Sequence, residues 1–159
     1  MMKKTCLSAA LILGAGMAQA GEYCLLDGTE VFSCTFNGGA KAVELCDAIW
    51  EDGDMASYGF FKSNGEVEKE ILQEKVTMLA TPWNGMGNYV SESVRFDADQ
   101  SYSYEVWSGG ERAEGAVLEG GINVIKNNDV IATLTCDTGS VTSDLGTLID
   151  MIDLAQVSP

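Results

Sequence analysis

Four cysteines behind an N-terminal leader constrain the fold of this chain more than any other feature. The leader places Lys3 and Lys4 before an apolar run over residues 7–17 and the small-residue motif Ala18-Gln19-Ala20. This order is typical of a secretory signal peptide, here residues 1–20. An even number of cysteines in an exported chain predicts two disulfides and a periplasmic protein. The four are Cys24, Cys34, Cys46 and Cys136.

One folded domain is expected over residues 21–159. Removing 20 of the 159 residues leaves a chain of 139 residues, close to the usual size of a single domain. No later apolar run approaches the roughly 20 residues that a bilayer-spanning helix needs. We therefore expect no membrane attachment after cleavage of the leader.

The charge of the chain is strongly acidic. The full sequence has 9 basic and 24 acidic residues, and loss of the two leader lysines would leave 7 against 24, a net charge of −17. Such a field repels phosphate backbones, which argues against a nucleic-acid partner, and attracts cationic partners over a Debye length of about 8 Å. Two interpretations stay open, namely that the acid keeps an exported protein in solution or that it recognises a basic protein.

Short alternating segments separated by turns predict an all-β fold, an antiparallel barrel or sandwich stapled by two disulfides. Only the C-terminal segment, at about residues 140–155, has the apolar spacing of a helix. The expected strands cover residues 31–36, 41–47, 56–62, 67–72, 89–96, 101–107, 122–126 and 129–136.

The inward positions of these strands supply enough apolar volume to fill the interior. A filled interior would leave no room for a small-molecule carrier, which needs an open pocket lined by Tyr58, Tyr102 and Tyr104. The expected core residues are Phe32, Phe36, Val43, Leu45, Tyr58, Phe60, Val94, Phe96, Tyr102, Tyr104, Val106 and Leu134.

Hairpin geometry excludes a bond between Cys34 and Cys46. A tight turn at Asn37-Gly38-Gly39 places Cys34 opposite residue 42 or 43 and Cys46 opposite residue 30 or 31, an offset of roughly 10 Å. A disulfide tolerates a Cα separation of at most about 7 Å. These two cysteines must therefore have other partners.

Strand faces then select the pairing. Cys34 and Cys136 both lie on apolar faces, so we expect them to form a buried bond that joins the first strand to the last. Cys46 shares a face with Glu44, so we expect it to point outward and to bond Cys24.

The sequence offers little for catalysis. It has no histidine, which removes the usual general base and zinc ligand, and the disulfides use the remaining cysteines. We expect no enzyme activity, no metal and no cofactor. An acid-only hydrolase is the remaining enzymatic alternative and needs two carboxylates facing each other in a cleft. The acidic clusters are Glu51, Asp52 and Asp54, then Asp97 and Asp99.

Glu92 interrupts an otherwise apolar strand face between Val90 and Val94. A buried carboxylate needs a partner or marks a functional site. The alternative is that Glu92 lies at the rim of the sheet.

Three segments are candidates for binding a partner. The loop at Trp83 offers an aromatic anchor in a flexible frame, the acidic turn offers charge, and a glycine-rich loop over residues 108–111 offers an accessible backbone. The candidate contact residues are Trp83, Asn84, Gly85, Asp52, Asp54, Ser108 and Glu111.

Ordered motifs run through residues 31–140, including Phe32-Ser33-Cys34, Val43-Glu44-Leu45-Cys46, Tyr58-Gly59-Phe60, a Trp-x-Gly-x-Gly loop at Trp83 and Ala132-Thr133-Leu134-x-Cys136-Asp137. Together they resemble an uncharacterised family of small periplasmic four-cysteine proteins of Gram-negative bacteria. This resemblance implies export and two disulfides, but no known activity. The chain departs from the pattern in its acidic segment at residues 50–54 and at Phe61.

A looser likeness is to the periplasmic C-type lysozyme inhibitors, small disulfide-bonded β-barrels that insert a loop into a basic enzyme. Size, acidity and the Ser108-Gly109-Gly110 segment are similar, whereas the Ser-Gly-x-x-Tyr loop of those inhibitors is absent. We therefore expect an exported, non-catalytic binding protein that recognises a cationic protein through its loops. The alternatives are a small-molecule carrier and an acid-only hydrolase.

Overall fold

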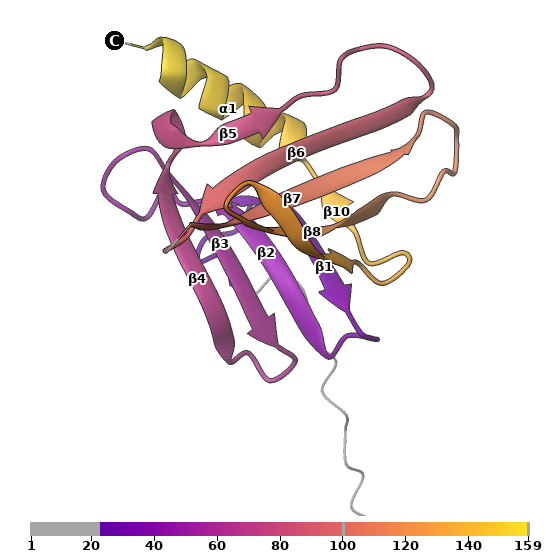
Figure 1. Ribbon diagram of the computed structural model, residues 1–159, viewed down its shortest axis with the longest axis horizontal. Coiled ribbons are helices and arrows are strands. Elements are labelled where there is room, and N and C mark those ends of the chain that lie inside the picture. The colour runs from indigo at the N-terminus through magenta and orange to yellow at the C-terminus, as the bar shows by residue number, and fades with distance from the viewer. Residues whose placement is uncertain (1–22, 100, 159) are drawn as a thin grey trace, which may run out of the picture.

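Two five-stranded antiparallel sheets face each other in the computed structural model of the protein, which describes residues 23–99 and 101–158 (Figure 1). The expected signal peptide at residues 1–20 lies outside the described residues. Sheet A has the order β10-β1-β2-β3-β4 and consists of β1 (Glu30–Phe36), β2 (Lys41–Asp47), β3 (Met55–Lys62), β4 (Val67–Glu74) and β10 (Thr142–Ser143). Sheet B has the order β5-β6-β7-β8-β9 and consists of β5 (Leu79–Thr81), β6 (Tyr89–Asp97), β7 (Tyr102–Glu111), β8 (Glu119–Lys126) and β9 (Asp129–Thr135).

The sheets do not close into a barrel. Sheet A ends in β10 and β4, and sheet B ends in β5 and β9. A short 3-10 helix, Lys75–Thr77, connects the two sheets between β4 and β5. Of the two architectures that the sequence allows, the sandwich is therefore correct.

One expected loop is wrong, because residues 108–111 form the end of β7. Gly109 pairs with Ser91 on β6 and with Glu119 on β8. A Cβ atom on Gly109 would lie 2.6 Å from the hydroxyl oxygen of Tyr89. Glycine here makes room for a neighbouring ring within the sheet, whereas in the sequence it suggests a turn.

The expected C-terminal helix is confirmed as α1, Leu145–Val157. Its apolar stripe contacts strands of both sheets and closes one end of the sandwich, at the top of Figure 1. Among the described residues, no helix is long and apolar enough to cross a membrane. The buried residues of α1 are Leu145, Leu148, Ile149 and Ile152.

Glu92 is half-buried beside the first turn of this helix. A Cβ atom on Gly146 would lie 3.5 Å from Oε1 of Glu92. The positive end of the helix dipole favours a carboxylate at this place. Glu92 thus has a structural neighbour in α1, and Gly146 leaves space for it.

Both expected disulfides are present. Cys24 bonds Cys46 with a Cα separation of 5.7 Å, and Cys34 bonds Cys136 with a separation of 5.8 Å. The expected register is also confirmed, since Cys34 lies opposite Val43 and Cys46 opposite Glu30. The bond from Cys34 connects sheet A to the segment after β9 of sheet B, so it ties two sheets together and does not close one.

Cys46 points to the outer face of sheet A and bonds Cys24, as expected, and the N-terminal segment covers it there. Cys46 and Glu44 both have no exposed surface. The backbone N–H groups of Tyr23 and Cys24 donate to Oε2 of Glu44 at 2.9 and 3.1 Å. A Cβ atom on Gly59 would lie 2.5 Å from the Tyr23 ring. The segment at residues 23 and 24 therefore packs flat over β2 and β3.

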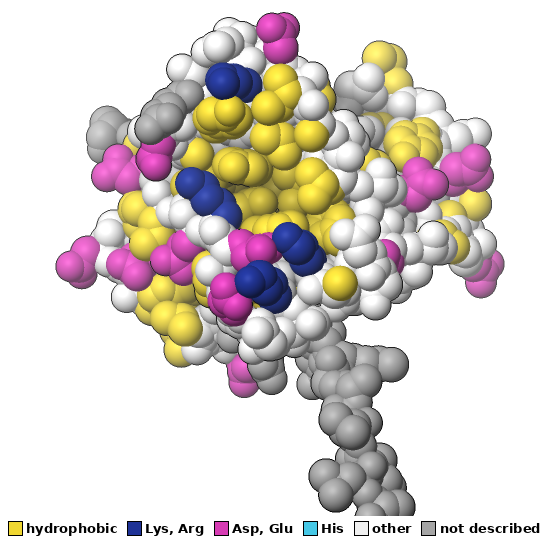
Figure 2. All heavy atoms as spheres, turned by 60° about the horizontal axis from the view of Figure 1, so that its bottom comes forward, with side chains coloured by type: hydrophobic (Ala, Val, Ile, Leu, Met, Phe, Trp, Pro, Cys, Tyr) yellow, Lys and Arg dark blue, Asp and Glu magenta, His cyan; other side chains and the backbone are white. Residues whose placement is uncertain are grey.

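The interior is filled at the end near α1 and open at the opposite end. Eight of the twelve expected core residues are buried. Figure 2, which brings the bottom of Figure 1 forward, shows a hollow lined with hydrophobic side chains and bordered by lysine or arginine side chains. We call this open end of the sandwich the mouth. The four expected core residues that stay partly exposed are Phe60, Tyr102, Tyr104 and Leu134.

Replacing both cysteines of one disulfide by alanine tests which bond contributes more stability. The Cys34–Cys136 bond encloses a sequence separation of 102 residues and the Cys24–Cys46 bond one of 22. Loop-closure entropy predicts losses of about 4–5 and about 3 kcal/mol respectively. Chemical denaturation of the two double variants measures the difference, and a larger loss for Cys24 and Cys46 would contradict the expectation.

Asp137 fixes the crossing from sheet B to sheet A. Its carboxylate accepts hydrogen bonds from the Gly38 and Gly39 backbone at 3.0 and 2.9 Å and from the Thr35 hydroxyl at 2.8 Å. The Gly38 N–H, followed by the Thr35 hydroxyl and the Gly39 N–H, lowers the pKa of Asp137 below its ordinary value. The ionised form is therefore the one that stabilises the turn after β1.

Asp137→Asn is expected to lower the free energy of unfolding by about 1–2 kcal/mol at neutral pH, because hydrogen bonds to a charged acceptor are lost. A depressed pKa contributes stability above the unfolded pKa of about 4, and that contribution disappears as the pH falls through the folded pKa. Thermal melts of both proteins from pH 7 to pH 2 should converge below about pH 4. A constant difference across this range would exclude the charged contact.

Candidate functional site

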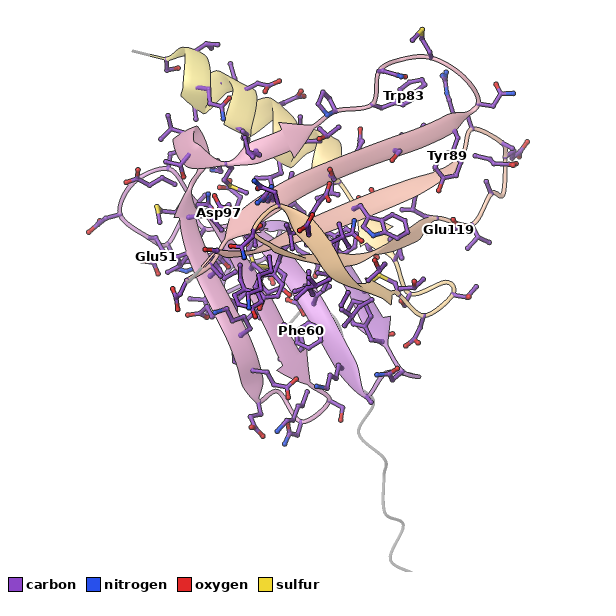
Figure 3. The ribbon with its side chains drawn as sticks, in the orientation of Figure 1. Glu51, Phe60, Trp83, Tyr89, Asp97 and Glu119 are labelled. Atoms are coloured by element: carbon purple, nitrogen blue, oxygen red, sulfur yellow. A yellow bond between two sulfur atoms is a disulfide. The ribbon has the colours of Figure 1, made fainter. Side chains whose placement is uncertain are left out.

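The loop after β5 and the adjoining ends of β6, β7 and β8 form one end of sheet B. We call residues 83–89 and 109–119 the Trp83 end. Tyr89 lies opposite Glu111 in the β6–β7 pairing, and the Arg112 N–H donates to the Asn88 carbonyl at 2.6 Å. Figure 3 shows Trp83, Tyr89 and Glu119 at this end of the molecule. Two of the three expected binding segments thus meet here.

Trp83 is held by contacts within this end. The ring is half-buried, and its Nε1 donates to the Met86 carbonyl at 3.3 Å. The Arg112 guanidinium lies 4.7 Å from the ring centroid, a cation–π distance. One face of the expected anchor is therefore occupied by the protein's own arginine.

Asn84 and Gly85 shape the loop around this ring. Oδ1 of Asn84 accepts a hydrogen bond from the Met86 backbone at 2.9 Å. Gly85 has a φ of 76°, which non-glycine residues rarely adopt. Their structural role is to present Met86 at the tip.

Three apolar side chains of the Trp83 end are exposed to solvent. Met86 is 72%, Val117 57% and Tyr89 46% exposed, and sequence alternation does not identify Met86 or Val117 as site residues. The Tyr89 hydroxyl lies 3.3 Å from Oε2 of Glu119. Partial burial, then the charge and hydrogen bond of Glu119, raise the pKa of Tyr89 above its ordinary value, so the phenol is neutral at physiological pH.

The Trp83 end also carries three carboxylates. Glu111, Glu114 and Glu119 are all exposed, and Arg112 is the one basic residue among the described residues of the Trp83 end. The net charge of the Trp83 end is therefore negative.

Three of the expected contact positions differ from the rest. Ser108 is buried, and its hydroxyl interacts with the Ser143 hydroxyl at 2.9 Å, so it joins sheet B to β10. Asp52 lies in the exposed turn between β2 and β3 and follows Glu51, which Figure 3 shows across the molecule from Trp83. The structure therefore does not bring Asp52 or Asp54 together with the Trp83 end.

Asp54 belongs to an ion-pair cluster with Lys75. Lys75 is 3% exposed and donates to Asp47 at 2.7 Å and to Asp54. Burial lowers the pKa of Lys75, but the two carboxylates outweigh burial and raise it above the ordinary value. Lys75 stays charged, and one oxygen of Asp54 is committed to it.

The remaining acidic clusters do not assemble a metal site. Among residues 23–99 and 101–158, no group of three or more cysteine, aspartate or glutamate side chains is placed to hold a metal ion. Asp97 and Asp99 are exposed, and Arg95 lies 3.5 Å from Asp97. Asp97 thus ends β6, and Asp99 lies in the bend that follows.

A surface groove of about 590 Å³ lies on the outer face of sheet A, away from the Trp83 end. Its walls mix apolar side chains with Glu51, Glu70 and Lys62. Because charges of both signs are interspersed there, the groove does not indicate one class of ligand.

Comparisons with protein-family models, curated proteins and solved structures found no match to this chain. The functional reading therefore depends on the geometry above.

Gly109→Ala tests whether glycine at this place serves the Tyr89 ring. The new Cβ would displace that ring, so we expect a loss of about 1 kcal/mol in the wild-type background. In a Tyr89→Ala background the same change should be neutral or slightly stabilising, because alanine favours strand backbone over glycine. Equal losses in both backgrounds, measured by denaturant unfolding, would exclude this packing role.

Proposed function

We propose that the protein is an exported, non-catalytic binding protein that recognises a cationic protein through the Trp83 end. One observation carries this proposal: the Trp83 end exposes three apolar side chains, Met86, Tyr89 and Val117, and carries three exposed glutamates. Exposed apolar groups rimmed by polar ones are typical of protein interaction surfaces.

The two parts of this surface would act at different steps. Carboxylates draw a basic protein toward the Trp83 end and raise the association rate, mainly at low salt. Apolar and aromatic side chains then supply contact energy once water is excluded, which slows dissociation. Trp83 would contribute indirectly, because its contacts with Arg112 and Met86 hold the loop in place.

Export is supported by the two disulfides. Bonds of this kind form and persist in oxidising compartments such as the periplasm. We propose the periplasm as the location on this ground, together with the sequence of residues 1–20.

Matched double variants test whether the carboxylates of the Trp83 end raise the association rate. Glu111→Gln/Glu114→Gln removes two charges from the Trp83 end, and Asp150→Asn/Asp153→Asn removes two from exposed positions of α1. The probes are a panel of basic proteins that includes a c-type lysozyme, each also with its lysines acetylated. We expect the first pair of changes to lower the association rate about threefold at low salt, and the second pair to have a smaller effect.

The double variant Met86→Ala/Tyr89→Ala tests whether the exposed apolar side chains supply contact energy in the complex. We expect a Kd about tenfold higher, mostly from faster dissociation. Surface plasmon resonance at low and moderate salt gives both rates. No binding to any basic protein at micromolar concentration would overturn the proposal, as would binding that is insensitive to salt, to lysine acetylation and to these substitutions.

A further inference from the structure

At the mouth, the apolar core of the sandwich reaches the surface of the molecule. Phe60 packs against Phe36 with ring centroids 5.7 Å apart, and Tyr104 packs against Tyr58 at 5.4 Å. Phe36 and Tyr58 are buried, whereas Phe60 and Tyr104 are partly exposed. In Figure 3, Phe60 lies in front of β2 and β3 and below the strands of sheet B. An apolar surface is thus accessible between the two sheets.

Strand register places lysines of sheet A on this same inner face. Residues directly opposite each other in an antiparallel pair project to one face of the sheet. Lys41 lies opposite Phe36, and Lys69 lies opposite Phe60. Lys62 lies opposite Lys41. By register the three lysines border the apolar surface, and Lys62, at the end of β3, also lines the groove on the outer face.

Sheet B adds a fourth lysine. Lys126 lies opposite Tyr102, and its Nζ is 4.9 Å from the Tyr102 ring centroid. The Nζ of Lys41 is likewise 5.6 Å from the Phe60 ring centroid. On both sheets an ammonium group is therefore in contact with an aromatic ring of the mouth.

This grouping contrasts with the rest of the molecule. Residues 23–158 contain seven basic residues, and these four lysines are more than half of them in a chain whose net charge is −15. Lys41 pairs with Glu68 at 2.7 Å and Lys62 with Glu66 at 2.8 Å. Within the described residues, Lys69 and Lys126 form no ion pair within 4.0 Å, although Asp129 lies opposite Lys126 on β9. The mouth thus retains positive charge beside an apolar surface.

We propose that the mouth binds a small amphiphilic anion, a single alkyl chain with a carboxylate headgroup. The chain lies along Phe60, Tyr104 and Leu134, and the headgroup is held by Lys69 and Lys126. Apolar burial supplies the attraction for the chain, at roughly 0.8 kcal/mol for each buried methylene. The lysines select the anion at short range, where the screened field of the distant acidic residues is weak.

Charge complementarity favours this occupant over others. An inorganic anion would leave the apolar surface exposed, and a neutral alkane would leave two lysines unpaired. A polyanion such as nucleic acid would meet the acidic remainder of the surface. The site is separate from the Trp83 end, and it does not depend on a protein partner.

Calorimetric titration with dodecanoate, below its micelle-forming concentration, is the direct test. We expect saturable binding with one ligand per chain, at least tenfold weaker binding of dodecanol and dodecyltrimethylammonium, and no measurable binding of acetate. Absence of saturable dodecanoate binding would overturn the proposal. Equal binding of all three alkyl compounds would overturn the role of the lysines.

Neighbouring positions on β9 provide a matched pair of variants that locate the site. Ala132 shares its face with Val124, Tyr104 and Phe96 and so faces the mouth, whereas Thr133 faces the other way. Both are exposed, so glutamate is tolerated at either. We expect Ala132→Glu to weaken dodecanoate binding at least tenfold and Thr133→Glu to change it less than twofold. Equal effects of the two would place the ligand elsewhere.

The lysines are tested with Lys69→Gln/Lys126→Gln. We expect at least tenfold weaker binding of dodecanoate and unchanged binding of dodecanol, while Arg112→Gln, which removes one positive charge at the Trp83 end, leaves both unchanged. Thermal melts verify that each variant is folded. Sedimentation of the wild-type protein and of Ala132→Glu tests whether a second copy of the chain occupies the mouth. A dimer that Ala132→Glu dissociates would show that it does and would overturn the proposal.

Discussion

The junction between β1 and the segment that follows β9 holds the two sheets in their observed relation. The Cys34–Cys136 bond crosses from sheet A to sheet B, and Asp137 immediately after it binds the β1–β2 turn. The chain then continues into β10, which pairs with β1, and into α1. Because this junction lies near one edge of both sheets, α1 can close one end of the sandwich while the opposite end stays open.

Separation of charge follows from the same architecture. Four lysines lie at the open end, where Glu66 and Glu68 pair with two of them, and further carboxylates occupy the Trp83 end and the exposed side of α1. Lys75 is the exception and is buried with Asp47 and Asp54, where it joins the β2–β3 turn to the connection between the sheets. The mouth thus gathers four lysines and the Trp83 end gathers three glutamates, and both have exposed or partly exposed apolar side chains.

Local rules were enough to predict the disulfides, the strands and the helix. The hairpin at Asn37 and the period of two along β1 and β2 determine where Cys34 and Cys46 point, so elimination gives the pairing. Alternation also identified the inward residues. It did not show that Phe60 and Tyr104 stay partly exposed, because that depends on how far the facing sheet extends.

Two features of the structure do not follow from the local sequence pattern, and for the same reason. The glycines after Ser108 suggest a turn in the sequence, but Gly109 accommodates Tyr89 from another strand. The outward direction of Cys46 follows from the strand pattern, but its burial does not, because Tyr23 and Cys24 cover it. In both cases the deciding neighbour is distant in the sequence, so no local pattern could reveal it. The lysines of the mouth were missed for the same reason, since their grouping appears only when the strands are in register.

The free edge of sheet B has a consequence for behaviour at high concentration. Among the strands that the structure describes, none pairs with the outer side of β9, and Val130 and Ile131 of this strand are more than half exposed. An unpaired apolar strand is a template on which a second molecule can add its own strand. Repulsion between strongly acidic copies opposes that contact. Salt screens this repulsion, so we expect the protein to associate through β9 more readily at high ionic strength than at low ionic strength.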